Sequence, residues 1–398
     1  MDSLTQIVLG AAVGETVAGR RLGNRALLWG GIGGTIPDLD VVANGFLTPL
    51  QALVTHRGFS HSILFAIMGA FVFGWLIHAM YKSPYHRHIA FIGWFALPAG
   101  VLFFFSRIFE AARLGVWSTG LLLLTLLGIG YVLFRKYFKS EITPPDVSLV
   151  TWRWLMFWTI VTHPLLDCFT TYGTQLFQPF SDYRVAFNTI AVADPFYTVP
   201  FLLCVIGASW LKRENQLRRK LIWTGLTVSS IYMAFCVFNK SRVDAHWVKT
   251  LASQDISYSR YMSSPSILSN FLWTMVAETE DGFVTGQYSI FDKSPTKTEY
   301  IPRNSTSRDI NLDDPSIERL RWFSNDYYSV INHSDGIQFN DLRFGSQLSK
   351  DGGKHYIFNF VLRPSADQLF EMIGSNGGPP PGEEQEMISQ LYTRIKGI

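Results

Sequence analysis

The stretch THRGFSHSILFAIMGAFVFGWLIHAM, residues 55–80, joins two histidines directly to a long apolar run. The run has the length and composition of a helix that crosses a bilayer, which needs about 20 mostly apolar residues. An imidazole or a charge at membrane depth is costly, so such a group is normally paired, bound to a metal or facing water. His56 and His61 therefore predict a polar site at one end of a membrane span.

Two further motifs place acidic and imidazole groups in apolar surroundings. TIPDLD closes an apolar stretch with Asp38 and Asp40, and VTHPLLDCF embeds His163 and Asp167 in another. Because each isolated group would be unfavourable in lipid, we expect the three motifs to meet in one polar site. A helical membrane domain would hold that site.

The composition divides the chain into two parts. Apolar residues make up 48% of the chain and charged residues 16%, and the mean hydropathy is +0.15. Residues 1–239 hold 18 of the 34 Lys and Arg and 11 of the 31 Asp and Glu, a net charge of +7, whereas residues 240–398 have a net charge of −4. This indicates a membrane domain over 1–239 and a soluble domain over 240–398. No basic block is interleaved with aromatic residues, so we expect no nucleic-acid partner.

The hydropathy pattern predicts a polytopic membrane domain. Six stretches are long enough to span a bilayer. They cover residues 62–80, 90–106, 114–134, 150–168, 194–211 and 221–238. Two shorter, Gly-rich stretches, 4–19 and 26–38, are either short spans or a re-entrant pair packed among the others.

Basic residues in short loops favour the cytoplasmic side of a membrane. The loop 211–220 carries five basic residues and one acid, and the loops 20–25 and 135–139 are also basic. Alternation from these loops puts all three polar motifs at the outer face. The last span then leaves residues 240–398 on the extracytoplasmic side.

Residues 240–398 show the alternating pattern of β-strands. Asp281-Gly282 between two alternating runs predicts a tight hairpin, and the stretches 335–345 and 354–364 predict further strands. Residues 377–381, GGPPP, predict a linker before a final helix near 383–397. We expect a smaller β-rich (α+β) domain, to which the sequence assigns no chemistry.

His163 and Asp167 are four residues apart, so they share one face of a helix. An imidazole and a carboxylate in that arrangement can hold one metal ion. The alternative is a neutral, hydrogen-bonded buried pair without a metal. Pro164, directly after the histidine, predicts a helix start or a kink at this point.

The other two motifs can also be interpreted without a metal. His56 and His61 flank Gly58 at a spacing that suits a loop turning into a helix, and the alternative is two solvated histidines in a cationic loop. Asp38 and Asp40 alternate, and such carboxylates suit hard or borderline cations. Without a metal, these aspartates would serve as a helix cap and as part of a solvated turn.

Imidazoles and carboxylates without a thiolate match a divalent metal that keeps positions open for water. Zinc is the leading candidate, with manganese or iron as alternatives, and such an ion activates water and polarises an ester or phosphoryl oxygen. Arg57 could hold a phosphate by paired hydrogen bonds, or it could anchor the chain at lipid headgroups. The candidate catalytic residues are Arg57, Ser60 and Asp40. The candidate metal ligands are Asp38, Asp40, His56, His61, His163 and Asp167.

The motifs TIPDLD, HRGFSHS and HPLLDCFTTYGTQLFQPFS resemble those of the YdjM-type bacterial membrane-bound metal-dependent hydrolases, a family of unknown function. That family is similar in its His and Asp pattern to zinc-dependent phospholipase C and P1 nuclease. The resemblance covers about residues 1–210. It implies a metal-dependent hydrolase of the bacterial inner membrane and the six metal ligands named above.

One departure from the family pattern affects the ligand set. Members often begin with a Thr-His pair, whereas this chain has Thr5-Gln6. Gln6 or Glu15 could replace that histidine. Asp182 and Asp194, on the outer segment after the last motif, are further ligand candidates, and a structural role is the alternative for both.

These observations lead to a hypothesis and two alternatives. The hypothesis is a membrane-embedded hydrolase that uses a divalent metal to cleave a phosphoester or ester, on a membrane lipid or lipid-linked substrate, at the outer face. The first alternative is a non-catalytic membrane protein that binds a metal for ion transport or sensing. The second is a purely structural role, in which the buried polar groups pair with one another.

Overall fold

The computed structural model describes residues 1–93, 95–96, 125, 127–139, 143–306, 310–348, 354–365, 369–375 and 384–397. These form two compact units, one of Met1–Met68 with Leu155–Ile398 and the other of Gly69–Trp154. The three polar motifs and the C-terminal β region all belong to the first unit. The expected spans 90–106 and 114–134 lie largely, and the expected linker 377–381 wholly, outside the described residues.

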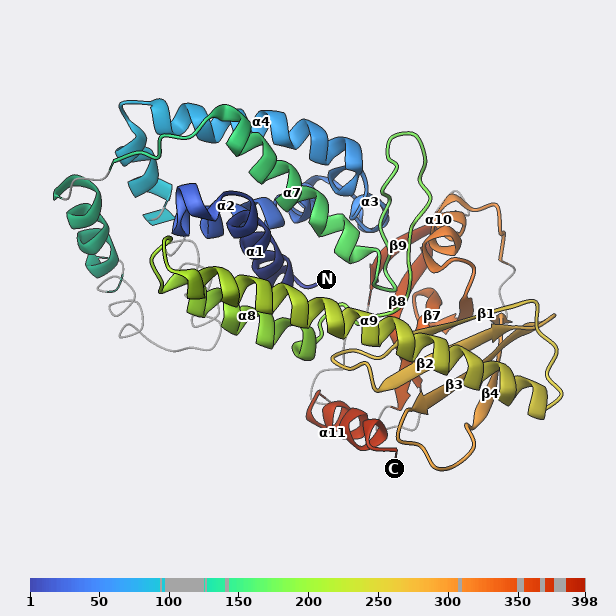
Figure 1. The fold of residues 1–398 in the computed structure, drawn as a ribbon. Coiled ribbons are helices and arrows are strands. Elements are labelled where there is room, and N and C mark those ends of the chain that lie inside the picture. Colours follow the sequence, from blue (N-terminus) through green and yellow to red (C-terminus); the bar gives the residue numbers. More distant parts are fainter. Residues whose placement is uncertain are drawn as a thin grey trace. The chain divides into compact units, whose positions relative to one another are not determined.

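The first unit begins with two helices, α1 (Ser3–Leu22) and α2 (Asn24–Thr35), which pack closely against each other (Figure 1). Gly23, with a φ of 56°, ends α1 and reverses the chain. A Cβ on Gly30 would lie 2.3 Å from the carbonyl oxygen of Gly10, so the contact requires glycine. The close packing brings the end of α2 beside the start of α1.

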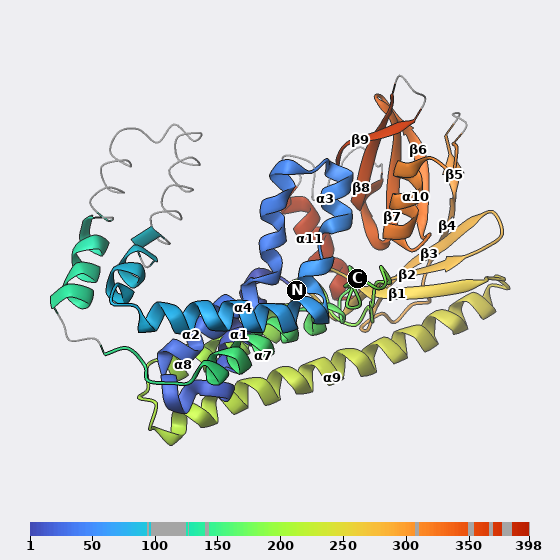
Figure 2. The ribbon, with the colours of Figure 1, turned by 90° about the horizontal axis from the view of Figure 1, so that it is seen from above.

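A hairpin of short helices follows α2. It consists of the 3-10 helix η1 (Pro37–Phe46) and the helix α3 (Pro49–Thr55), which lie side by side (Figure 2). Proline has no N–H group, so the hydrogen-bond ladder of α2 does not continue through Pro37. Thr48 and Gln51 form a capping box that starts α3.

The helices α4 (Ile63–Lys82) and α7 (Leu149–Asp167) each contribute residues to both units. The second unit also contains a π-helical turn, η3 (Arg135–Lys139). Within this unit the ring of Tyr81 stacks on Trp152, with ring centroids 5.4 Å apart.

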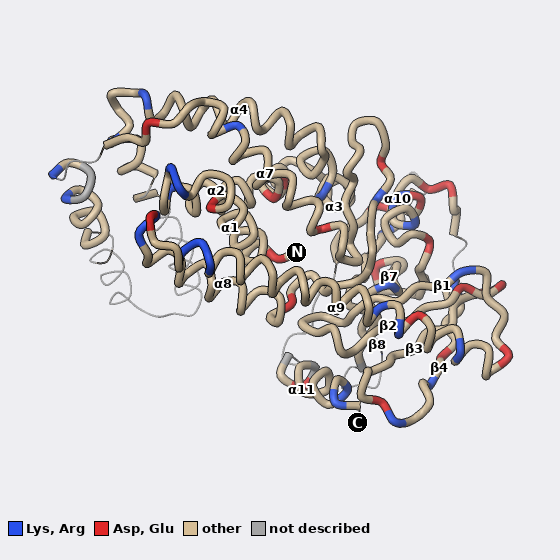
Figure 3. The backbone as a smooth tube through the Cα atoms, in the orientation of Figure 1, with Lys and Arg blue, Asp and Glu red and all other residues tan. Residues whose placement is uncertain are grey.

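Among the described residues, two helices are long and apolar enough to cross a membrane: α4 and α9 (Gln216–Ser253). The expected span 194–211 corresponds to α8 (Pro195–Ser209), an apolar helix of only 15 residues. Charged residues gather near the ends of α1, and α8 carries none (Figure 3). The structure therefore confirms that the N-terminal region is helical. That the chain crosses the membrane several times remains a prediction.

Helix α9 continues from the helical region into the β region without a break. The expected domain boundary at 239/240 falls inside it. Asn239 marks this point, because its side-chain N–H group donates to the carbonyl oxygen of Asn270 at 2.6 Å. Beyond it, Val243, Trp247 and Leu251 pack on the first sheet.

The β region contains two sheets. The first is antiparallel in the order β1-β2-β3-β4, and the second has the order β5-β6-β7-β8-β9, with only β5 and β6 parallel. The strands are β1 (Arg260–Pro265), β2 (Leu272–Glu278), β3 (Gly282–Ser289), β4 (Thr298–Pro302), β5 (Asn304–Ser305), β6 (Tyr328–His333), β7 (Gly336–Leu348), β8 (Lys354–Pro364) and β9 (Phe370–Ser375). The helices are α10 (Pro315–Ser324) and α11 (Glu384–Ile395). The predicted hairpin, the two predicted strands and the final helix are all confirmed.

Two apolar clusters hold the β region together. One lies between the sheets and includes Phe283, Leu342 and Tyr356. The other joins α10 to the second sheet through Phe323, and it also contains Tyr172 from the loop after α7. The helical region and the β region therefore share a core.

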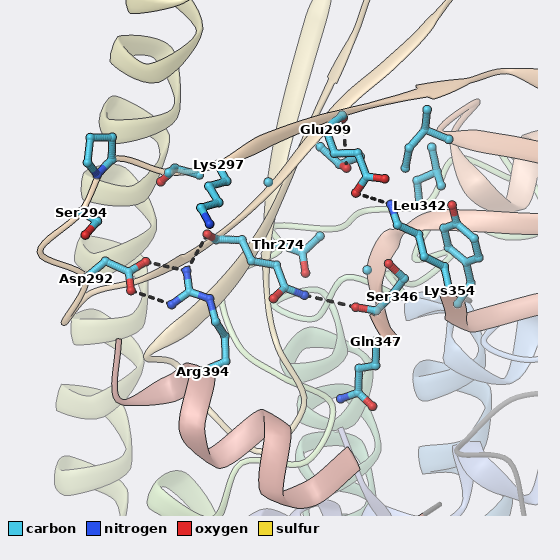
Figure 4. A pocket seen from close by; sticks show the side chains of 18 of the residues that line it. Thr274, Asp292, Ser294, Lys297, Glu299, Leu342, Ser346, Gln347, Lys354 and Arg394 are labelled. Atoms are coloured by element: carbon cyan, nitrogen blue, oxygen red, sulfur yellow. Dashed lines mark hydrogen bonds and ion pairs between the residues drawn. The ribbon is translucent and has the colours of Figure 1, made fainter. Parts of the chain in front are cut away.

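A cleft of about 490 Å³, with several charged side chains in its lining, lies where β3, β7 and α11 come together (Figure 4). Arg394 on α11 forms two 2.6 Å contacts with Asp292, and Lys354 pairs with Glu299. These charges neutralise one another. The Arg394 pair attaches α11 to the loop after β3, the Lys354 pair joins β8 to β4, and we assign the cleft no ligand.

Candidate metal centre

The three motifs meet at one place in the first unit. Asp38 comes from the first turn of η1, His61 from the end of the short helix η2 (Phe59–His61), and His163 from the last turn of α7. One ligand atom from each lies within 4.8 Å of the others, an arrangement that could hold a metal ion. More than a hundred residues separate the histidines in the sequence.

The distances between these atoms suit a small cation. The two Nε2 atoms of His61 and His163 are 3.1 Å apart, and Asp38 Oδ1 lies 3.4 Å from the first and 3.3 Å from the second. In a tetrahedral zinc site with metal–ligand bonds of about 2.0–2.1 Å, neighbouring ligand atoms are about 3.3–3.4 Å apart. The three atoms therefore match three corners of such a site.

The hydrogen bonds of the two imidazoles favour metal binding. His163 Nδ1 lies 2.6 Å from the carbonyl oxygen of Gly34, which can only accept, so Nδ1 carries the proton. His61 Nδ1 lies 3.0 Å from Ser60 Oγ and 3.5 Å from Asp40 Oδ2. With both Nδ1 atoms donating, both Nε2 atoms present lone pairs to the same point, as in known metal sites.

Asp167 is the candidate for a fourth ligand. It lies one helical turn after His163, and its Oδ2 atom is 3.5 Å from His163 Nε2 and 3.7 Å from His61 Nε2. This oxygen is buried and accepts no hydrogen bond, although Arg57 Nε lies 3.2 Å away. The guanidinium of Arg57 balances part of this charge, and a metal ion would supply a further partner for the oxygen. The residues present therefore fit a divalent metal with imidazole and carboxylate ligands.

Gln6 and the amino group of Met1 complete the surroundings of this carboxylate. Gln6 Nε2 donates to Asp167 Oδ1 at 2.9 Å and to the carbonyl oxygen of His163 at 3.2 Å. The Met1 amino group pairs with the same oxygen. Gln6 therefore lies at the centre, where its own Oε1 atom has no hydrogen-bond donor.

Asp40 organises the loop that carries the histidines. Its Oδ1 atom lies 3.0 Å from His56 Nδ1, and its Oδ2 atom accepts hydrogen bonds from Arg57 N and Ser60 Oγ, both at 3.1 Å. Both oxygens are thus already engaged. Asp40 and His56 lie next to the three-atom group rather than within it, and their role as direct ligands remains a prediction.

Gly58 shapes this loop. The N–H group of Gly58 donates to the carbonyl oxygen of Thr55 at 2.9 Å, and a Cβ would lie 2.7 Å from the same oxygen. Only glycine permits so tight a turn. The turn points His56 and His61 toward one side, where their rings lie 5.9 Å apart.

Burial and hydrogen bonding set the charge states here. Burial lowers the pKa of His61 to about 4, so this imidazole is neutral near pH 7. Burial alone would raise the pKa of Asp40, but the hydrogen bond with His56 and the nearby imidazoles outweigh it, and the pKa lies below its usual value. A neutral imidazole is the form that binds a metal.

Arg57 is buried, at 4% exposure, which does not fit anchoring at lipid headgroups. Its Nη1 atom donates to Thr170 Oγ1 at 2.9 Å, and its guanidinium lies 4.7 Å from the ring of Tyr172. Its φ of 60° is unusual for a residue other than glycine. Such conformations often occur at functional sites.

Tyr172 connects the centre to the β region, a role that the sequence did not reveal. Its ring contacts the guanidinium groups of both Arg57, at 4.7 Å, and Arg184, at 4.6 Å. It also contacts Phe323 of α10, with ring centroids 5.2 Å apart. No local signal in the sequence links residue 172 to residue 323, because their contact depends on the tertiary fold.

The remaining candidates lie elsewhere. Glu15 forms a buried ion pair with Arg218, through contacts of 2.7 and 2.6 Å. Asp194 caps α8 by accepting from Phe196 N at 3.0 Å. Asp182 is exposed in the loop after α7. The structure brings none of these three carboxylates into contact with the candidate metal ligands.

A family model described as YdjM inner membrane protein matches residues 1–110 and 114–243. The chain belongs to this family. The match includes all three motifs and extends through the apolar part of α9, so membership of YdjM rests on most of the chain. No curated protein and no solved structure matches the sequence. The family description names a membrane location and gives no reaction.

Proposed function

We propose that this YdjM family member is a membrane-embedded metal-dependent hydrolase of phosphoesters or esters on a lipid or lipid-linked substrate, acting at the outer face of the bacterial inner membrane. The convergence of the Nε2 atoms of His61 and His163 with Asp38 Oδ1, at separations of 3.1 to 3.4 Å, carries this proposal. Both imidazoles are held by their Nδ1 atoms, so the lone pairs are fixed in place. A zinc ion would fit this donor set, and manganese and iron are alternatives.

Asp38, His61 and His163 would hold the ion, with Asp167 as a fourth ligand and water in a further, open position. When bound, such an ion acidifies water and polarises a phosphoryl or acyl oxygen. Asp40 and Ser60 fix the orientation of His61. These contacts keep its Nε2 atom directed at the centre.

The leaving alcohol needs a proton when water adds across the ester bond. His56 is hydrogen-bonded to Asp40 at 3.0 Å, and its side chain is 27% exposed, unlike the buried His61 and His163. We assign it the role of proton donor to the leaving oxygen. Arg57 already forms an ion pair with Asp167. Its guanidinium would also stabilise negative charge on a substrate bound near that carboxylate.

Exposed apolar side chains around the centre support a lipid substrate. On η1, Val42 is 67% and Phe46 90% exposed, and in the loop after α7 Phe180 is 85% exposed. Helix α4, a candidate span, begins at Ile63, two residues after His61. The apolar residues would therefore contact the bilayer close to the metal ligands, where an amphiphilic substrate is available.

The test is the metal content and the activity of the purified protein. We expect one divalent ion per chain by elemental analysis, and hydrolysis of phospholipid in mixed micelles or of a chromogenic phosphodiester. His163→Ala should lose both. His333→Ala, which removes a histidine of the β region, should lose neither. Unchanged metal content in His163→Ala would contradict the proposal.

A second candidate function is metal binding without catalysis. Burial favours it, because the side chains of His61, His163 and Asp167 are fully buried, and Asp38, at 21%, is the exposed member of the set. A substrate would have to reach the ion past Asp38. Full metal occupancy without hydrolysis of any ester substrate would select this function.

A further inference from the structure

A second charged site lies at the other end of α1. Near the turn between α1 and α2, the second half of α1 lines a cavity of about 600 Å³ together with the turn between α8 and α9 and the first residues of α9. Five basic side chains and two acidic ones line it. The basic residues are Arg20, Arg213, Arg218, Arg219 and Lys220, and the acidic ones are Glu15 and Glu214. This site shares no residue with the metal centre.

The acidic residues neutralise only part of this positive charge. Glu15 is paired with Arg218, and Glu214 is paired with Arg213 at 2.6 Å. Within the described part of the chain, no carboxylate pairs with Arg20, Arg219 or Lys220. The cavity therefore keeps an excess of three positive charges, to which the positive end of the α9 dipole adds.

Hydrogen bonds between the two turns hold the walls of the cavity in place. Arg218 Nη1 donates to Asn24 Oδ1 at 2.6 Å and to the carbonyl oxygen of Leu211 at 2.8 Å. Asn24 Nδ2 donates to the carbonyl oxygen of Ser209 at 2.8 Å. The basic side chains thus surround a preformed space rather than extending from a loose loop.

The cavity opens where the surface of α9 changes from charged to apolar. Trp223, which lines it, is 48% exposed, and further along the helix Ile231 is 65% and Phe238 61% exposed. Tryptophan is enriched at the boundary between headgroups and acyl chains. A molecule in the cavity could therefore place an anion on the basic residues and apolar chains along α9.

We propose that this cavity binds the phosphate of an anionic phospholipid headgroup, such as phosphatidylglycerol or cardiolipin. Basic pockets at the ends of membrane helices are known to bind such headgroups. Free phosphate offers the same charge but no acyl chains. The apolar surface beside Trp223 therefore favours the lipid as the source.

The test compares lipid binding by the full-length protein in detergent micelles. The triple variant Arg20→Gln/Arg219→Gln/Lys220→Gln removes the unpaired charges and leaves the Arg218 network intact. At about fivefold per basic residue, we expect the three changes together to weaken phosphatidylglycerol binding on the order of 100-fold, as measured by native mass spectrometry and titration. Arg242→Gln/Lys249→Gln/Lys293→Gln, which makes the same change in net charge on exposed residues of the second half of α9 and the β region, is the matched control.

Three results would overturn the proposal: equal weakening in the control, equally tight binding of phosphatidylcholine by the wild-type protein, or displacement of the lipid by millimolar inorganic phosphate. The last would identify free phosphate as the ligand. Metal content is measured on the same samples, and the triple variant should keep it. Failure of the hydrolase proposal and failure of this one are therefore distinguishable.

Discussion

The two ends of α1 hold charged groups in opposite ways. Gln6 and Arg20, which mark the two ends, are separated by about 21 Å of helix. At the Gln6 end, carboxylates and imidazoles are buried and compensated by Arg57 and the Met1 amino group. At the Arg20 end, a positive excess remains and faces a cavity. A buried charge needs a partner within the protein, whereas a charge that faces a cavity can be neutralised by a ligand.

Breaking the buried ion pair at the Arg20 end should produce the largest effect. Arg218→Met leaves Glu15 buried without its partner, and such a loss costs about 3–5 kcal/mol of the free energy of unfolding. Equilibrium unfolding in detergent micelles measures it. Arg213→Met, which breaks an exposed pair in the same cavity, should change stability little. Equal losses in both variants would mean that burial is not the decisive difference.

At the Gln6 end, two histidine variants distinguish a residue that binds the metal directly from one that only positions a ligand. His61→Ala should weaken metal binding by roughly 100-fold or more, since removing a partner of a ligand already costs about 10–100-fold. His56→Ala should weaken it by roughly 10-fold, because His56 acts through Asp40. Competition with a chelator of known affinity measures both. A larger effect for His56→Ala would reverse the two assignments.

Separating α1 from α2 should affect the metal centre through the backbone. Gly30→Ala places a Cβ against the carbonyl oxygen of Gly10, and overpacking of this kind costs about 1–3 kcal/mol. Because α2 also supplies the carbonyl oxygen that holds His163, metal affinity should fall as well. Gly45→Ala is the control, since its Cβ would meet nothing within 4 Å. Thermal unfolding with and without added metal tests both.

The smallest expected effect concerns the hydroxyl group of Tyr172. It donates to the carbonyl oxygen of Leu53 at 3.2 Å, and losing one hydrogen bond costs about 0.5–1.5 kcal/mol. Tyr172→Phe should therefore unfold slightly more easily and keep its metal. Tyr172→Leu removes the ring that contacts Arg57 and Arg184 and should be less stable than Tyr172→Phe. Identical unfolding of the two variants would show that the ring does not join the regions.

The sequence predicted the convergence of the three motifs because lipid strongly penalises isolated polar groups. His61, His163 and Asp38 had few other ways to be satisfied, and the structure brings them together. The β hairpin was predictable for a similar reason, since Asp281-Gly282 suits only a tight turn. In both cases the local sequence pattern is compatible with few structures.

Other features could not be predicted, because they depend on tertiary packing. The carbonyl oxygen of Gly34 holds His163, and a backbone atom leaves no signal in the sequence. Glu15 looked like a possible ligand until the structure paired it with Arg218, about 200 positions away. The number of membrane crossings also stays a prediction, since hydropathy does not distinguish α8, a helix of 15 residues, from a full span.

The unbroken course of α9 joins an apolar first part, long enough to cross a membrane, to a second part that packs on the first sheet. Its 38 residues extend for about 57 Å, with apolar residues exposed on the first part and Trp247 seated on the sheet in the second. Because the helix is continuous, a tilt of its first part also moves its second part. If the first part of α9 crosses the bilayer, as its composition predicts, a change in bilayer thickness that tilts it would also displace β1–β4, which begin beyond Asn239 in the chain.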